Sequence, residues 1–325
     1  MSQHVINLYI CTNDNAMVTE FKNLLSLLDF FKEEQTCIDY LASQRWGDTP
    51  SCPHCGNVGA YVTNRGYKCK AKECHKKFTV TTGSIFENTK ISLRYWFAAI
   101  YLGTSHKKGI SSLQLSRDLN ITQKTAWFLL HRIREMLTDN APEMLTGIVE
   151  VDETYIGPKH RNKHKKERAK LNENGTGAVN KTPVVAMLQR DGNMVTVVAP
   201  VANGETIKPF IYKHVAKGAT VYTDGFGAYK GLDRDYTHEV VYHDKDEYVK
   251  AGNIHTNSIE GFWSHLKRGI NGTYHQVSRK HLHRYCHEFG YKYNTRKAVD
   301  IARFDGVIKR ADNKRLTYKL LIKTK

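Results

Sequence analysis

Apolar residues recur at helical spacing in two stretches of the first 140 residues. Residues 17–46 (MVTEFKNLLSLLDFFKEEQTCIDYLASQRW) predict one or two packing helices, and residues 91–137 are expected to be helical again. In the second stretch the turn LNIT separates two helices, and their packing residues are Ile110, Leu113, Leu115 and Leu119, then Ala126, Leu129, Leu130 and Ile133. Thr122 suits the N-cap of the later helix. The pattern favours a helix-turn-helix over a plain helical hairpin.

The start of that later helix holds Gln123, Lys124 and Thr125. In a helix-turn-helix, this end of the recognition helix meets base edges and phosphates in the major groove of DNA. We therefore expect these three residues to contact DNA.

From Gly147 to about residue 300 the pattern changes to β runs followed by helices. Strands are predicted over TGIVEVDETYIG, TPVVAMLQR, NMVTVVAPV, GATVYTDG and YTHEVVYH, with RDGN as a turn and GETIKPFIYKHV as a helix. This order is typical of an α/β or α+β domain. In the first strand, alternation places Glu150, Asp152 and Thr154 on one face, and Val149, Val151 and Tyr155 on the other.

The stretch HTNSIEGFWSHLKRGI, residues 255–270, predicts an amphipathic helix. Its apolar face consists of Ile259, Phe262, Trp263, Leu266 and Ile270, and its polar stripe of Asn257, Glu260, Ser264 and Lys267. One interpretation of the stripe is structural, with Asn257 as the cap and Glu260 closing a capping box. The other is that Glu260 projects away from the core to do chemistry.

The overall charge points to a polyanionic partner. The 325 residues include 49 Lys and Arg against 32 Asp and Glu, which gives a net charge of +17. Such an excess favours binding of nucleic acid over an ordinary basic enzyme. Apolar runs reach only about nine residues, as in YWFAAIYLG, so no membrane helix is expected. With no signal-like start either, we expect a cytoplasmic protein.

A basic insertion is predicted between the first two strands, at residues 158–182. It carries seven Lys and Arg with one Glu from Lys159 to Lys170, followed by glycine-rich polar sequence. The alternatives are a DNA-contacting arm and a solvated loop without a further role.

Four of the seven cysteines lie close together in the sequence. Cys52 and Cys55 are separated by two residues, and Cys69 and Cys74 by four. Four thiolates from two such pairs can close a tetrahedral shell around a structural zinc ion. The motif CPHC also resembles a redox dithiol, but the second pair favours zinc.

Three acids have the types and positions needed for a two-metal site. Asp152 lies within the first strand, Asp224 ends the run TVYTD, and Glu260 follows Asp224 with 35 residues between them. Carboxylates on neighbouring strands can converge, and a third from a nearby helix completes the ligands for two magnesium ions.

This D…D-x35-E arrangement with a trailing Lys267 resembles the DDE transposases and retroviral integrases. The stretches VEVDETYIG, GTGAVNKTPVVAML, VYTDGFGAY, HTNSIEGFWSHLKRGINGTYHQVSRKHLHRYCHEFGYKYNTR and CIDYLASQRWGDTPSCPHCG are similar to the ISXO-type insertion-sequence transposases. The resemblance implies an RNase H-like core with a mixed five-stranded sheet flanked by helices. It also implies that Asp152, Asp224 and Glu260 hold Mg²⁺ or Mn²⁺ and that Lys267 is catalytic.

We therefore expect an α+β multidomain protein. Its parts would be an N-terminal helical segment (1–48), a zinc ribbon (49–90), a helix-turn-helix region (91–140), the RNase H-like core (147–300) and a basic C-terminal segment (301–325). The last segment carries eight Lys and Arg against two acids and is either a helix packed on the core or a phosphate-binding tail.

The expected activity is that of a transposase in the bacterial cytoplasm, associated with the nucleoid. It would bind the terminal inverted repeats of its element, cut the phosphodiester bond at each end and join the 3′-hydroxyl to target DNA. Lys267, Arg268 and Asn257 would contact DNA near the scissile phosphate, and paired ends require at least a dimer. The alternatives are a domesticated DNA-binding regulator and an RNase H-like nuclease that cuts branched DNA.

Overall fold

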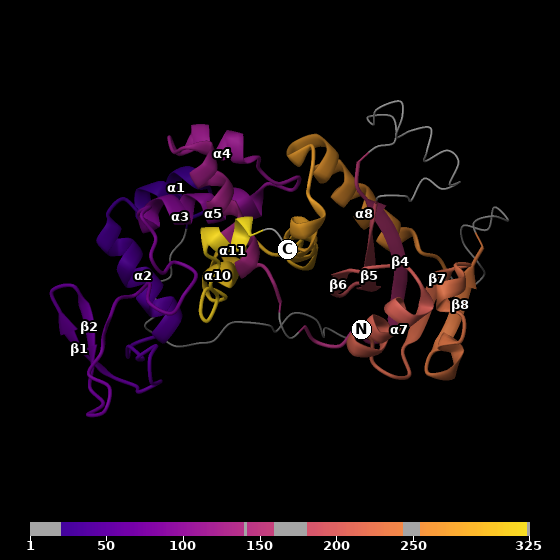
Figure 1. Ribbon diagram of the computed structural model, residues 1–325, viewed down its shortest axis with the longest axis horizontal. Coiled ribbons are helices and arrows are strands. Elements are labelled where there is room, and N and C mark those ends of the chain that lie inside the picture. Colours follow the sequence, from indigo (N-terminus) through magenta and orange to yellow (C-terminus); the bar gives the residue numbers. More distant parts are fainter. Residues whose placement is uncertain (1–20, 140–141, 159–180, 243–253, 324–325) are drawn as a thin grey trace, which may run out of the picture.

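The structure is a computed structural model, and it describes residues 21–139, 142–158, 181–242 and 254–323. The predicted basic insertion, apart from residues 158, 181 and 182, lies outside these ranges. In Figure 1 a body of helices lies on one side and a five-stranded sheet with its own helices on the other. None of the helices in the described part of the chain combines the length and apolar content needed to cross a bilayer.

The helical body combines both ends of the described chain. Its helices are α1 (Leu24–Phe30), α2 (Glu34–Trp46), α3 (Leu93–Ser105), α4 (Ser112–Asp118), α5 (Gln123–Met136), α10 (Asp300–Ile308) and α11 (Tyr318–Ile322). Phe304 of α10 is fully buried against Phe31 and Phe97. Of the two alternatives for the C-terminal segment, the structure shows a packed helix: α10 contributes its apolar face to the core of the N-terminal helices.

Helices α4 and α5, which follow one another across a short turn and contact each other, are the pair that the sequence predicted as a helix-turn-helix. The chain reverses at Asn120, which has a φ of +50°, and the hydroxyl of Thr122 accepts a hydrogen bond from the backbone N–H of Thr125, as expected of the N-cap. One packing residue was predicted wrongly, because Leu113 is 51% exposed. Residues two apart on a helix point about 200° apart, so Leu113 cannot share the buried face of Leu115.

A small antiparallel sheet, together with the turns beside it, carries the four cysteines. Its strands are β1 (Ala60–Thr63), β2 (Gly66–Cys69) and β3 (Lys77–Phe78). Trp46, at the end of α2, packs edge-on against the rings of Tyr67 and Phe78 and so joins the ribbon to the helices. Gly66 has a φ of +125°, and a Cβ there would approach the carbonyl oxygen of Phe78 to 2.6 Å, so the hairpin turn requires glycine.

The larger sheet is mixed, with strand order β6-β5-β4-β7-β8. Its strands are β4 (Ile148–Ile156), β5 (Thr182–Gln189), β6 (Met194–Val198), β7 (Thr220–Asp224) and β8 (Thr237–Val241). Strand β4 pairs antiparallel with β5 and parallel with β7, and β7 pairs parallel with β8. Strand β4, the first of these strands in the sequence, therefore lies at the centre of the sheet.

Helices cover both faces of this sheet. Helix α7 (Gly204–His214) buries Ile207 and Ile211 with Val149 and Val151 on one face. Helices α8 (Asn257–Gly269) and α9 (Leu282–Asn294) cover the other face, where the predicted apolar residues of α8 are all buried. The α+β multidomain architecture and the mixed five-stranded sheet are therefore as predicted.

A buried ion pair joins the helical body to the core. The Nε of Arg134 in α5 donates to Glu288 in α9 over 2.7 Å, and the Nζ of Lys292 donates to the same carboxylate over 2.6 Å. The hydroxyl of Tyr274 is a third donor to Glu288. The side chains of Arg134, Glu288 and Lys292 are almost fully buried. These charged groups have lost contact with water and pair with one another, and in doing so they join the helical body to the core.

Candidate active site and metal centres

Two of the predicted acids meet where β4 and β7 separate. Regular pairing of these parallel strands covers Ile148–Glu150 opposite Thr220–Tyr222 and then stops. Asp152 and Asp224 both lie beyond the last pair, so the gap between the strands receives their side chains. Crevices at the carboxyl ends of parallel strands are common ligand sites in such sheets.

Glu153 joins this pair, and the sequence interpretation missed it. The three side chains each place a carboxylate oxygen so that these oxygens, from Asp152, Glu153 and Asp224, lie within 4.8 Å of one another. In a regular strand, adjacent residues point to opposite faces, so the side chain of Glu153 would point away from that of Asp152. Its longer side chain nevertheless reaches the gap between the strands, where its Oε2 accepts a 2.6 Å hydrogen bond from the hydroxyl of Tyr229. The adjacent acids in the motif VDE were the available signal.

Hydrogen bonds orient the oxygens of the two aspartates. Oδ1 of Asp152 accepts from the backbone N–H of Glu153 over 2.8 Å, and Oδ2 accepts from Nε1 of Trp263 over the same distance. Oδ1 of Asp224 accepts from the backbone N–H of Phe226 over 3.0 Å. Asp152 is therefore held by one neighbouring donor and one donor from α8, whereas the donor to Asp224 comes from the turn that follows it.

The environment of the cluster disfavours negative charge. The pKa of Asp152 is raised to about 6, mainly by burial and also by the charges of Asp224 and Glu260, while the hydrogen bond from Trp263 acts in the opposite direction. The pKa of Glu153 is likewise raised to about 7, mainly by burial and also by the charges of Asp152 and Asp224, against the hydrogen bond from Tyr229. Hard oxygen ligands with unbalanced negative charge are the donor set that Mg²⁺ and Mn²⁺ prefer, so these residues fit such ions.

Glu260 lies beside this cluster but outside the group of three. It stands exposed in the first turn of α8, close enough for its charge to raise the pKa of Asp152. Lys267 lies about 10 Å further along the helix axis, also exposed. Arg268 is exposed beside it and donates to the backbone and hydroxyl oxygens of Ser264. The stripe predicted from the sequence thus faces away from the core.

The capping interpretation of this stripe is wrong. Thr256 is the N-cap residue of α8 and makes no side-chain cap, and exposed Asn257 is the first residue of the helix. The backbone N–H of Ile259 donates instead to Oε2 of Glu150 in β4, over 3.0 Å. Like Glu153, Glu150 is a residue to which the sequence interpretation gave no role, although alternation placed Glu150 on the same face as Asp152.

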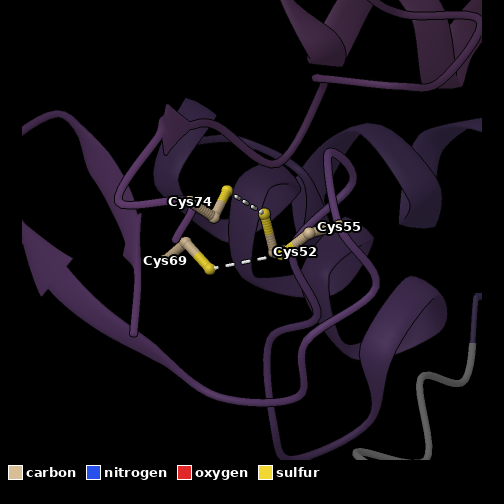
Figure 2. Close-up of side chains that lie close together, drawn as sticks. All are labelled: Cys52, Cys55, Cys69 and Cys74. Carbon is tan, nitrogen blue, oxygen red and sulfur yellow. Dashed lines mark hydrogen bonds between the residues drawn. The ribbon is translucent and has the colours of Figure 1, made fainter. Parts of the chain in front are cut away.

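The four cysteines form a compact group in the ribbon (Figure 2). Sγ of Cys52 lies 3.8 Å from Sγ of Cys74, and Sγ of Cys55 lies 3.6 Å from Sγ of Cys69. Sulfurs placed about 2.3 Å from a central zinc ion define a tetrahedron with edges of about 3.8 Å. The distances and the donor type therefore fit one structural zinc ion.

The predicted DNA-contacting residues stand at the start of α5. Gln123 and Lys124 are exposed, whereas Thr125 is half-buried. Gln123 donates to the hydroxyl of Ser112 over 2.8 Å, which ties the two helices of the pair together. The ammonium of Lys124 lies 4.8 Å from the ring centroid of Tyr318, so α11 flanks this end of the helix.

Two family models match the parts of the chain that hold the cysteines and the acidic cluster. A transposase zinc-ribbon domain matches residues 32–77, and an ISXO2-like transposase domain matches residues 144–294. The chain is 32% identical over 272 residues to a protein in the transposable element ISH50 of Halobacterium salinarum, covering 80% of this chain and 90% of that protein. It is 29% identical over 100 residues to a transposase-like protein of Haemophilus influenzae, covering 30% of this chain and 79% of that protein.

Proposed function

The chain belongs to the family of ISXO2-like transposases, and from this premise we propose that it cuts and joins DNA by metal-dependent phosphoryl transfer. It would hydrolyse the phosphodiester bond at each end of its element and join the freed 3′-hydroxyl to target DNA. The observation that carries the proposal is the meeting of Asp152, Glu153 and Asp224 at the separation of β4 and β7, beside Glu260.

Asp152 and Asp224 would hold two Mg²⁺ or Mn²⁺ ions, with Glu260 as the third ligand. When bound, such a pair stabilises the attacking and leaving oxygens of an in-line displacement. Trp263 and the backbone of Glu153 keep the two oxygens of Asp152 aimed in fixed directions. Tyr229 does the same for Glu153, which offers a fourth carboxylate at the same place.

Basic side chains would position the DNA. Lys267 and Arg268 stand on the exposed side of α8 beyond Glu260, where they would contact the phosphate backbone next to the scissile bond, and Asn257 would contact DNA at the start of the helix. The zinc ribbon adds further Lys and Arg side chains, and its four cysteines would hold a structural zinc ion.

The start of α5 would bind the double-stranded terminal repeats through Gln123, Lys124 and Thr125. Two paired ends require at least a dimer. The site of action would be the nucleoid in a bacterial cytoplasm.

DNA binding by α5 has a test of its own. Replacing Lys124 by Ala should weaken binding to terminal-repeat DNA and reduce the slope of log K against log salt by about 1, because one phosphate contact is lost. Lys217→Ala, at an exposed lysine of the core, is the matched control and should leave the slope unchanged. An unchanged slope for Lys124→Ala would place the DNA elsewhere.

The central experiment is a cleavage-and-joining assay with Mg²⁺ on DNA that carries the element's own end. The wild type should nick at the end and join it to target DNA, and Glu260→Gln should bind without doing either. Glu205→Gln is the matched control, because Glu205 is also an exposed acid in the first turn of a helix. Glu153→Gln tests whether the missed carboxylate is a ligand.

The outcomes separate the alternatives. Cutting without joining would indicate a nuclease, and binding without cutting by the wild type would indicate a regulator. Full activity of Glu260→Gln together with inactivity of Glu153→Gln would indicate that the third metal ligand is Glu153 in β4 and not Glu260 in α8.

A further inference from the structure

The feature that the scheme above leaves unused is the carboxylate of Glu150. It lies on β4 two residues before Asp152, on the same face of the strand, and its side chain is fully buried. An acid at such a position is expensive to bury unless its charge and hydrogen-bonding capacity are satisfied.

Each oxygen of Glu150 has a specific partner. Oε2 accepts from the backbone N–H of Ile259 over 3.0 Å, and Oε1 accepts from Nε of Arg190 over 2.9 Å. Nδ1 of His255 lies 3.6 Å from Oε1, and Nη2 of Arg190 donates to the backbone oxygen of His255 over 2.9 Å. The guanidinium of Arg190 also lies 4.8 Å from the ring centroid of Tyr222 in β7. The carboxylate thus connects β4 with the turn after β5 and with the start of α8.

The bond to Ile259 takes the place of a helix cap. The first four N–H groups of a helix have no partner within it, and the side chain of Thr256 supplies none for α8. A carboxylate is a favourable partner there because the N-terminus of a helix carries partial positive charge. The cap of α8 is therefore supplied by the central strand of the catalytic sheet.

A second bond ties the same helix to the same strand. Trp263, one turn beyond Ile259, donates to Asp152, two residues beyond Glu150. Four residues of helix rise about 6 Å, and two residues of strand extend about 6.6 Å, so the two bonds match in spacing. Together they set both the direction and the register of α8 along β4. Glu260, next to Ile259, is placed by this register.

We propose that Glu150 is a positioning residue that fixes the start of α8 on β4 and so holds Glu260 beside Asp152. The inference rests on the proposed function, because it concerns the geometry of the same metal site. Glu150 does not itself contact a reacting group. Its effect passes through Ile259 to the neighbouring carboxylate.

The test uses Tb³⁺, a hard ion that binds carboxylate sites and emits light when a nearby indole absorbs. Trp263 serves as the indole because it is bonded to Asp152, and Trp263→Phe identifies the emission that comes from this site. In the full-length protein, Glu150→Ala should weaken Tb³⁺ binding about tenfold or more, as loss of outer partners of metal ligands commonly does. Glu150→Gln keeps an oxygen for the Ile259 N–H and should restore most of the affinity.

Two controls separate positioning from stability. Ile211→Ala removes a buried side chain on the opposite face of the sheet, so it should lower the melting temperature and leave Tb³⁺ affinity unchanged. If Glu150→Ala does not fold, the double variant Glu150→Leu/Arg190→Met removes both buried charges at nearly constant volume and takes its place. Wild-type Tb³⁺ affinity in a folded variant without the Glu150 carboxylate would overturn the inference.

Asp152→Asn distinguishes this failure from failure of the proposed function. If Asp152→Asn binds Tb³⁺ as tightly as the wild type, the acidic cluster is not a metal site and the proposed function fails. If Asp152→Asn loses the ion while the Glu150 variants keep it, only the positioning role is refuted.

Discussion

Nε1 of Trp263 donates a hydrogen bond to Oδ2 of Asp152 over 2.8 Å, from a helix that is 111 residues away in sequence. Trp263 is 4% exposed, so its large apolar surface packs between α8 and the sheet while its one donor reaches the acidic cluster. A single side chain thereby joins the core of the domain to the proposed chemistry. A buried tryptophan avoids the free-energy penalty of an unpaired N–H when that N–H donates a hydrogen bond of this kind.

Replacing Trp263 by Phe should impair cleavage more than folding. The ring remains apolar and buried, but the hydrogen bond to a charged acceptor, worth about 1.5–3 kcal/mol, is lost. We expect a roughly tenfold or larger fall in the cleavage rate at subsaturating Mg²⁺, measured against Mg²⁺ concentration. Trp127→Phe, in α5, is the matched control. Equal rates for the two variants would contradict an orienting role.

Replacing Cys69 by Ser should remove the bound zinc and unfold the ribbon. Four thiolates close the shell, and the fold of small zinc domains depends on the metal. Elemental analysis should find one zinc ion per wild-type chain and a large loss in Cys69→Ser, with a red shift of Trp46 emission as Tyr67 and Phe78 move away. Cys286→Ala, a buried cysteine of α9, should keep its zinc. Unchanged zinc content in Cys69→Ser would refute the four-cysteine site.

Replacing Glu288 by Gln should be strongly destabilising. Arg134 and Lys292 would then be buried without their counter-charge, and breaking a buried ion pair costs about 3–5 kcal/mol. The measurement is urea unfolding at pH 7. Glu135→Gln breaks the partly exposed pair with Arg284 and should cost less than about 1 kcal/mol. Similar losses in the two variants would mean that the buried network does not stabilise the junction.

The pH dependence of stability should reflect His131. Neither of its ring nitrogens has a hydrogen-bond partner in the described residues, and burial lowers its pKa from 6.5 to about 2. Between these values the unfolded chain binds a proton that the folded chain does not, so stability falls as the pH drops below about 6.5. The slope is about 1.4 kcal/mol per pH unit for each such histidine.

His131→Phe should therefore reduce the slope of the free energy of unfolding against pH between pH 6 and pH 5. The reduction should correspond to about one proton, as measured by urea unfolding. At pH 7.5 its stability should equal or exceed that of the wild type, because two unpaired polar atoms are removed from the interior. His281 and His287, each with a pKa lowered to about 4, would keep the remaining slope. An unchanged slope in His131→Phe would contradict this assignment.

Periodicity and spacing were enough to predict the local structure and much of the chemistry. The apolar face of α8, the N-cap at Thr122 and the strand ending at Asp224 follow from patterns within a few residues, because helices and strands expose side chains at fixed intervals. The cysteine quartet follows for the same reason, since each pair lies within a short turn. Asp152 and Asp224 could be expected to converge because carboxylates on neighbouring strands of one sheet can meet at one point, but the parallel pairing of β4 with β7 came only from the structure.

Periodicity predicts which face of a helix or strand is buried, but it does not predict which other element packs against that face. Nothing local indicates that α10 would cover the N-terminal helices, that Glu153 would reach the gap beyond the last β4–β7 pair, or that Glu150 would cap α8. These relationships join residues up to about 270 positions apart, and they depend on how the strands diverge and how the helices dock. Long-range packing decides them, because a carboxylate acquires its role from the groups brought to it by the fold.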